Sequence, residues 1–238
     1  MNGPNRFVGV DVQVARACPY AVVDSGGRAL DSGWLEGATD TDIVEDLRAV
    51  VCHQASTDSG RVAVGIDAPR CPLPMPRAWY WDRSRLAWRE RRPSDRGYGR
   101  HCEVVIAAHR IANPQWTPCG RAFPPWMRLG FALFAGMRDV AGLYEVFPAA
   151  SYKLLARDNS ISVEVRLGDL APGPKDMLDA YVAAITVREF VQGRGQAVGG
   201  GDHLGEIVLP RPVPSPIPAV DQWPAAGGAD IAFYVGDR

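Results

Sequence analysis

The sequence contains almost no lysine, no closely spaced cysteine pair and no long apolar run. Lys153 and Lys175 are the only lysines among its 26 basic residues, so arginine carries nearly all of the positive charge. The five cysteines are odd in number and form no C-x-x-C pair, which excludes a zinc ribbon and argues against a disulfide framework. No apolar run approaches the ~20 residues of a membrane-spanning helix, and the first residues lack the pattern of a secretory signal. We therefore expect a cytoplasmic protein that does not bind a membrane.

The overall charge is close to zero, which limits how the chain can attract a partner. Its 238 residues carry a formal net charge of −1, and 47% of them are hydrophobic. Such a chain has no general attraction to nucleic acid or to acidic membranes, so any binding of nucleic acid needs a local basic patch. The length and the apolar fraction fit a single α/β domain over residues 1–238.

The apolar patterning predicts a mixed sheet covered by helices on both faces. A strand at 6–12 precedes a hairpin of strands at 18–24 and 29–36, which are joined through the two-glycine turn "SGGR". Later apolar strands alternate with segments of helical periodicity, which is typical of parallel strands linked by helices. Two more strands are expected at 61–69 and 142–148, and helices at 40–54, 126–138, 149–156 and 174–192. We therefore expect an α/β fold with a five-stranded sheet.

Two segments depart from this regular alternation. Residues 69–126 hold five of the seven tryptophans and many of the prolines. A structureless loop of that length is unusual in a compact domain, so we interpret it as an insertion or lid after the fourth strand, with one helix near 99–111. A Gly-rich loop at 199–201 leads into "GEIVLP", which we expect to be a strand. A Pro-rich tail follows over about 210–238 and ends in "DIAFYV", which has the composition of an edge strand.

Two of the apolar strands end on an aspartate. The tetrapeptides are "VGVD" at 8–11 and "VGID" at 64–67. Because side chains alternate along a strand, each aspartate shares a face with the glycine two residues before it. Ligands of buried α/β sheets collect at the carboxyl ends of the strands, and a glycine removes bulk where a ligand or metal would approach. We therefore expect Asp11 and Asp67 to lie side by side at one ligand-binding edge of the sheet.

Three further acids could join this pair. Glu145 lies within the apolar strand "LYEVFP", and Asp176 and Asp179 share one face in the first turn of the last long helix. Clustered carboxylates repel each other unless they share protons or hold cations, and oxygen ligands without His or Cys suit Mg²⁺ or Mn²⁺. Taken singly, each aspartate could cap a helix or end a turn, and Glu145 could pair with a buried arginine. Together they favour a shared acidic site in which Asp11, Asp67, Asp176 and Asp179 bind metal.

The predicted insertion combines arginines with aromatic residues. Between Arg70 and Arg100 lie nine arginines, counting both ends, against three acids, with tryptophans and tyrosines interleaved. Arginine for phosphates and aromatic rings for base stacking are a common means of holding single-stranded nucleic acid. Arg70, Arg100, Trp79 and Trp81 are therefore candidate substrate-binding residues. The alternative is that the aromatic residues pack a lid and that the arginines reflect the composition of the chain.

Several motifs, in their order and spacing, resemble one widespread family. "FVGVDVQ", "VGIDAP", "YEVFPAA" and "KDMLDAYVAA" before "EIVLP" are similar to the domain of unknown function numbered four-two-nine, which is predicted to comprise ribonuclease H-like nucleases. "RHCE" at 100–103 also resembles an Arg-x-Cys-acid motif of that family. The resemblance covers nearly the whole chain and implies a ribonuclease H-like fold, with metal-binding acidic positions that match Asp11, Asp67, Glu145 and Asp179. One departure is that many members follow the first aspartate with a glycine and then a Gly-Trp pair, where this chain has "DVQVARACPY".

The leading hypothesis is a divalent-metal-dependent nuclease or phosphodiesterase. Asp11, Asp67 and Asp179 would bind the metal, Glu145 would be a ligand or orient water, and the insertion would hold DNA or RNA. One alternative is a non-catalytic nucleic-acid-binding or adaptor protein, in which the acids have structural roles. Another is an actin-like ATP-dependent phosphotransferase, which would need Gly/Ser/Thr phosphate loops that "DVQVA" and "DAPRC" do not supply.

Overall fold

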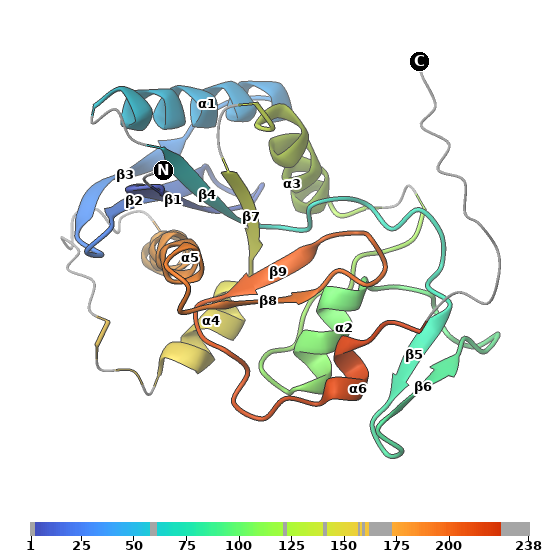
Figure 1. Ribbon diagram of the computed structural model, residues 1–238. Coiled ribbons are helices and arrows are strands. Elements are labelled where there is room, and N and C mark those ends of the chain that lie inside the picture. Colours follow the sequence, from blue (N-terminus) through green and yellow to red (C-terminus); the bar gives the residue numbers. More distant parts are fainter. Residues whose placement is uncertain are drawn as a thin grey trace.

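Seven strands form one mixed sheet at the centre of the fold (Figure 1). The computed structural model describes residues 3–57, 61–120, 123–139, 142–156, 158, 160–161 and 173–224. The strands of the sheet are β1 (Arg6–Asp11), β2 (Cys18–Asp24), β3 (Ala29–Leu35), β4 (Val62–Asp67), β7 (Gly142–Val146), β8 (Gln196–Gly199) and β9 (Glu206–Leu209). Their spatial order is β3-β2-β1-β4-β7-β9-β8, in which β1, β4, β7 and β9 run parallel and the other pairs are antiparallel.

The predicted α/β class is confirmed, but the predicted number of five strands is wrong. The five expected strands are β1, β2, β3, β4 and β7, and two more extend the sheet beyond β7. β9 adds in parallel with Ile207 opposite Glu145, and β8 then pairs antiparallel with β9. The strand expected at "GEIVLP" is β9, although it was not counted in the predicted sheet, whereas β8 has only four residues, which is too short for apolar periodicity to identify. The edge strand expected at 230–235 lies outside the described residues.

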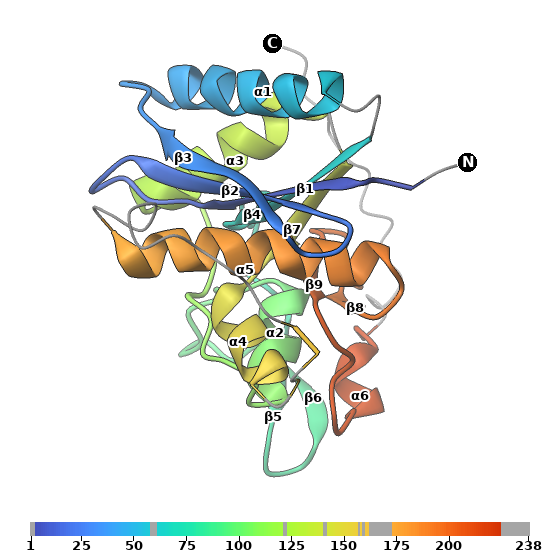
Figure 2. The same cartoon turned by 90° about the vertical axis from the view of Figure 1, so that its left-hand side faces the viewer.

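Helices cover both faces of the sheet, as Figure 2 shows. α1 (Asp40–Ser56) and α3 (Pro125–Gly136) lie on one face. α5 (Pro174–Val191) crosses the opposite face over β1, β2 and β4, and α4 (Pro148–Leu155) packs beside it. No helix in the described part of the chain is long and apolar enough to cross a membrane.

The alternation of side chains along β1 explains the two cores between these layers. Val8 and Val10 point to the α1 and α3 side, where they join a buried cluster with Leu47 of α1. Phe7 points to the other side, into a second buried cluster with Ala180 of α5. Because both faces of β1 are covered, its sequence is apolar at nearly every position rather than at every second one.

A second group of elements packs below the sheet in Figure 1. The hairpin β5 (Trp79–Asp82) and β6 (Ala87–Glu90) and the helix α2 (His101–Ala108) come from the stretch between β4 and α3. The short helix α6 (Pro218–Asp221) belongs to the Pro-rich tail and packs against α2 and β6. These elements enclose a third buried apolar cluster together with β8 and β9. The helix expected near 99–111 is α2, whereas no sequence signal identified the hairpin.

The glycines before the two strand-end aspartates face a helix rather than a ligand. A Cβ atom at Gly9 would overlap the backbone oxygen of Ala180 and the backbone nitrogen of Ala184 in α5. A Cβ at Gly65 would lie 2.7 Å from Val187 and 2.9 Å from the backbone oxygen of Ala183. The expectation that these glycines make room for a ligand is therefore wrong, because the space that they leave is filled by α5.

We predict that Gly9→Ala destabilises the protein by about 3 kcal/mol or more, because overpacking against a helix backbone cannot be relieved by a side-chain rotation. Urea unfolding followed by circular dichroism would measure the loss. Gly3→Ala is the matched control, since a Cβ at Gly3 meets no atom within 4 Å. Equal stabilities for the two variants would contradict the proposed contact between α5 and β1.

Candidate active site

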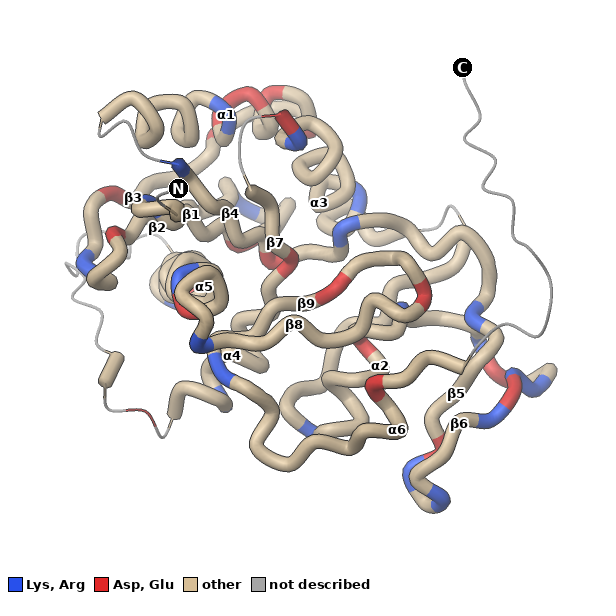
Figure 3. The backbone as a smooth tube through the Cα atoms, viewed as in Figure 1, with Lys and Arg blue, Asp and Glu red and all other residues tan. Residues whose placement is uncertain are grey.

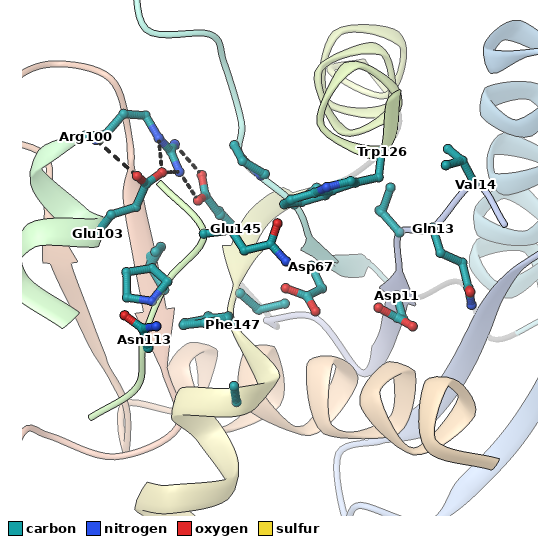
Figure 4. Close-up of a pocket in the computed structure, with 18 of the residues that line it drawn as sticks. Asp11, Gln13, Val14, Asp67, Arg100, Glu103, Asn113, Trp126, Glu145 and Phe147 are labelled. Carbon is teal, nitrogen blue, oxygen red and sulfur yellow. Dashed lines mark hydrogen bonds and ion pairs between the residues drawn. The ribbon is translucent and has the colours of Figure 1, made fainter. Parts of the chain in front are cut away.

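β1 and β4 end on aspartates that lie next to each other. The parallel register pairs Asp11 with Asp67, and neighbouring strands are about 4.8 Å apart. Both side chains line one pocket at the carboxyl ends of the strands, where Figure 4 shows them at its floor. Within the described residues, neither carboxylate forms a hydrogen bond or an ion pair. This is the juxtaposition that the sequence predicts.

The first turns of α5 bring two more acids to this edge. Asp179 is only 8% exposed, and its Oδ1 has no hydrogen-bond partner in the described structure. The Nζ of Lys175, four residues earlier on the same helix, forms an ion pair with its Oδ2. Asp176 forms an ion pair of 2.5 Å with Arg16, which lies between β1 and β2. α5 thus brings both acids to the end of β1, and each is matched by an exposed cation.

The acids raise one another's proton affinity. Burial, followed by the charges of Asp179 and Asp176, raises the pKa of Asp11 to about 7. Burial, followed by the charges of Asp11 and Asp179, also raises the pKa of Asp67 well above its usual range. Since the carboxylates are close and poorly solvated, the site favours bound protons or bound cations near neutral pH.

Two neighbours of Asp179 were not identified from the sequence. Lys175 is one of only two lysines, and its i, i+4 spacing to Asp179 was a usable signal. The hydrogen bond to Asp179 raises the pKa of Lys175, so its ammonium stays charged beside the acids. Tyr152 of α4 lies close enough to Asp179 that burial, followed by the charge of Asp179, raises the pKa of its hydroxyl. Its proximity depends on the packing of α4 on α5.

Glu145 is engaged in a buried ion network. Arg100, only 1% exposed, donates from Nη1 to Glu145 Oε2 at 2.7 Å and from Nη2 to Glu145 Oε1. The backbone N–H of Arg70 donates to the same carboxylate at 2.9 Å. The structure therefore corrects two expectations: Arg100 is not exposed to hold a phosphate, and Glu145 pairs with a buried arginine. A carboxylate without solvent needs such partners.

The same guanidinium also joins β7 to the loop before α3. Arg100 donates from Nε and Nη2 to Glu103 Oε1, both at 3.0 Å. Glu103 in turn accepts from the backbone N–H of Thr117 at 2.9 Å and from its hydroxyl. The network thus runs from β7 through Arg100 and the first turn of α2 to the loop at Thr117. It fixes two walls of the pocket relative to each other.

Aromatic residues of the predicted insertion pack mainly against the protein itself. Trp81 meets Trp88 edge-on, with the ring centroids 5.4 Å apart, and both rings pack against the third apolar cluster. The guanidinium of Arg77 lies 4.1 Å from the Tyr80 ring centroid, which ties that side chain to the hairpin. Trp79 alone of the candidate aromatic residues lines a surface hollow, of about 620 Å³.

The arginines of this region differ in their partners, and several exposed ones, Arg83 and Arg91 among them, also donate to backbone oxygens. Arg70 donates from Nη2 to the backbone oxygen of Leu143 at 2.8 Å, and Arg89 forms two hydrogen bonds to Asp95 at 2.7 and 3.0 Å. Other arginines are exposed on the hairpin and the loop after it, where Figure 3 shows positive charge. Exposed and free of any ion pair within the described residues are Arg83, Arg91, Arg92 and Arg96.

The pocket has a volume of about 510 Å³ and two chemically different ends. One end carries the carboxylates of Asp11 and Asp67. The other is lined by Phe147 and a loop with exposed amide side chains, and the Trp126 ring stands above the acids in Figure 4. Such a volume lies within the ~300–1,000 Å³ typical of small-ligand sites.

The acids as placed do not yet enclose a metal ion. Across the described ranges, no group of three His, Cys, Asp or Glu side chains is arranged to hold one. Asp11 and Asp67 are available, but the third candidate, Asp179, is turned toward Lys175.

Comparisons of the chain with protein-family models, with curated proteins and with solved structures found no match. The family resemblance drawn from the motifs therefore stays an expectation. The assignment of function depends on the geometry and chemistry of the pocket.

Arg100→Met is expected to destabilise the fold by about 3–5 kcal/mol, because it leaves two carboxylates buried without their cation. Guanidinium chloride unfolding would measure this loss. Arg85→Met is the control, since the Arg85 side chain is 78% exposed and its substitution should change stability little. A small loss in Arg100→Met would show that the network does not hold the pocket walls.

The raised pKa of Asp11 predicts a stability that falls as pH rises. Between about pH 4 and about pH 7 the folded chain keeps a proton on Asp11 that the unfolded chain has released, so rising pH favours unfolding. In Asp11→Asn the free energy of unfolding should change with pH by roughly 2–4 kcal/mol less than in wild type. Urea unfolding of both proteins near pH 5 and near pH 8 measures it, with the exposed-site variant Glu36→Gln as control. The same change in the free energy of unfolding between the two pH values in wild type and in Asp11→Asn would refute the prediction.

Proposed function

We propose that this chain is a divalent-metal-dependent phosphodiesterase that hydrolyses nucleic acid on a ribonuclease H-like fold. The observation that carries the proposal is the set of coupled carboxylates, Asp11, Asp67 and Asp179, at the carboxyl ends of β1 and β4. The mixed sheet with helices on both faces, with acids at these strand ends, agrees with what the motif resemblance implies.

The donor set fits a hard divalent cation. All the candidate ligands are carboxylate oxygens, which suit Mg²⁺ or Mn²⁺ better than zinc. The buried Asp179 Oδ1 lacks a partner in the described structure, and burial, followed by the charges of neighbouring carboxylates, raises the pKa values of Asp11 and Asp67. Asp11 and Asp67 would hold the ion, and Asp179 would join them when its ion pair with Lys175 opens.

The chain's own residues would orient the substrate and control charge. A bound cation would neutralise the phosphate and activate a water for attack on phosphorus. Lys175, released from Asp179, would supply a positive charge at the rim of the site, where its side chain is 79% exposed. Glu145 would act through Arg100 and Arg70 as a positioning residue, because its carboxylate is already fully engaged.

Basic residues outside the pocket support a polyanionic substrate. Arg91 and Arg92 line the hollow that contains Trp79, and both are exposed. Trp79 is partly buried, and arginine beside an accessible aromatic ring is a common arrangement for contacts to phosphate and base. These arginines would bind phosphates of the nucleic acid at a distance from the acids. Their attraction would offset the repulsion between the phosphate at the site and the carboxylates.

A non-catalytic adaptor is the second candidate. The observation that favours it is the structural role of Glu145 with the buried Arg100, together with the ion pair that occupies Asp179. The unpartnered carboxylates of Asp11 and Asp67 favour the hydrolase, because a purely structural site would be expected to pair them. An ATP-dependent phosphotransferase has no comparable support.

Isothermal titration with Mn²⁺ and cleavage of labelled DNA and RNA test the proposal. Wild type should bind Mn²⁺ and release shortened products, whereas Asp11→Asn and Asp67→Asn should weaken binding at least about tenfold and abolish cleavage. Glu36→Gln, a charge change at an exposed site, is the control for nonspecific loss of charge.

The outcomes separate the two candidates. Absence of Mn²⁺ binding by wild type would overturn the metal-dependent hydrolase. Binding of Mn²⁺ and of nucleic acid without any cleavage would favour the adaptor.

A further inference from the structure

We propose that the pocket beside the acids binds one unpaired nucleobase, so that the substrate is single-stranded nucleic acid. This rests on the proposed function, because the phosphate attached to that base would then lie over Asp11 and Asp67. It goes further in assigning a base-binding wall to the residues opposite the acids and in excluding an intact duplex.

Two aromatic rings flank the open end of the pocket. Trp126 stands in the first turn of α3, and Phe147 directly follows β7. Figure 4 shows the Trp126 ring above Asp67 and the Phe147 ring to the left of it, so that the two rings border different sides of the pocket. Both rings are partly buried, Trp126 against the core under α1 and α3, and Phe147 against the cluster around α2. Neither stacks on another ring within the described chain, so the inward faces can contact a planar group.

Amide side chains complete this wall. Asn113 and Gln115 lie on either side of the buried Pro114, and all three line the pocket. Both amides are exposed, and their side chains form no hydrogen bond in the part of the chain that the structure describes. An amide offers a donor and an acceptor together, which matches the mixed donor and acceptor edge of a base.

The loop that carries these amides is held in place. Thr117, two residues after Gln115, is buried, bonds Glu103 through its N–H and hydroxyl, and accepts from the N–H of Gly99 at 2.8 Å. The network around Arg100 therefore positions the amide wall relative to β7 and Phe147. Arg100 and Glu145 thus position the loop, although their charged groups are already paired with each other.

The size of the pocket selects an unpaired base. About 510 Å³ suits a ligand of the size of one nucleotide, and a base can lie between the ring and amide walls of this pocket only after it has left its stack and its partner. Stacking on aromatic rings and hydrogen bonding through the base edge are the usual means of reading an unpaired base. A small apolar ligand would use the rings but leave the amides and the adjacent carboxylates without a role.

The test is fluorescence anisotropy with labelled DNA and RNA oligonucleotides, each offered single-stranded and as a duplex. Binding is measured in EDTA, so that it does not depend on a metal ion, and hydrolysis is then measured with Mn²⁺. The single strand should bind at least about tenfold more tightly than its duplex, given the stacking that one base contributes.

Variants identify the wall. Asn113→Ala and Gln115→Ala should each weaken binding of the single strand about threefold, and Trp126→Ala about tenfold, with circular dichroism confirming that each variant is folded. Gln222→Ala, at an exposed amide that does not line the pocket, should leave binding unchanged. Because Asn113 and Gln115 are exposed and make no internal hydrogen bonds, their substitution should not disturb the fold.

The results distinguish this inference from the proposed function. Equal binding of single strand and duplex, or unchanged binding in the Asn113, Gln115 and Trp126 variants, would overturn the base pocket even if Mn²⁺-dependent hydrolysis is observed. Pocket-dependent binding of the single strand in EDTA, without hydrolysis in Mn²⁺, would support the base pocket and overturn only the hydrolase.

Discussion

The acidic pocket depends on the direct contact between the backbone of α5 and strand β1. At Gly9 the helix lies so close that no side chain fits between them. This approach carries the first turn of α5 to the carboxyl end of β1 and brings Asp179 and Asp176 beside Asp11. Repulsion among these carboxylates opposes the contact, whereas burial of apolar surface along the rest of the helix favours it. The charge imbalance that makes the pocket a candidate cation site is therefore maintained by packing at a distance from it.

A second constraint acts from the other side of the pocket. Arg100 is buried between Glu145 and Glu103 and joins β7 to α2, and Glu103 in turn binds the loop before α3 through Thr117. Removal of three charges from water is costly, and such a cluster is stable only when its geometry satisfies every member. The Arg100 network orients the loop before α3, whose own backbone has few regular hydrogen bonds. The position of the loop with Asn113 and Gln115 thus depends on Arg100, Glu103 and Glu145, whose charged groups are already paired with one another.

Part of the fold and of the site could be predicted from single residues and short spacings. Apolar runs marked β1, β4 and β7, and helical periodicity marked α1, α3 and α5, because burial on one or two faces leaves a local pattern. The segment of β9 was expected to be a strand but was not counted in the sheet, and the four-residue strand β8 left no pattern, so the predicted sheet had too few strands. Asp11 and Asp67 were found because a carboxylate at the end of a buried strand is anomalous. The role of Arg100 was predicted wrongly from the arginine-rich stretch that contains it. The local sequence of such an arginine is the same whether its side chain faces solvent or a buried glutamate.

The sequence by itself determined the α/β class, the buried parallel strands and the aspartates at their ends, since these follow from local composition and the alternation of side chains. Only the tertiary structure decided which acids meet, which arginine is buried, and that the glycines accommodate a helix. It alone placed Trp126, Phe147 and Asn113 around one pocket. These residues come from three separate segments, and their proximity depends on packing between elements distant in the chain, for which a single sequence carries no local signal.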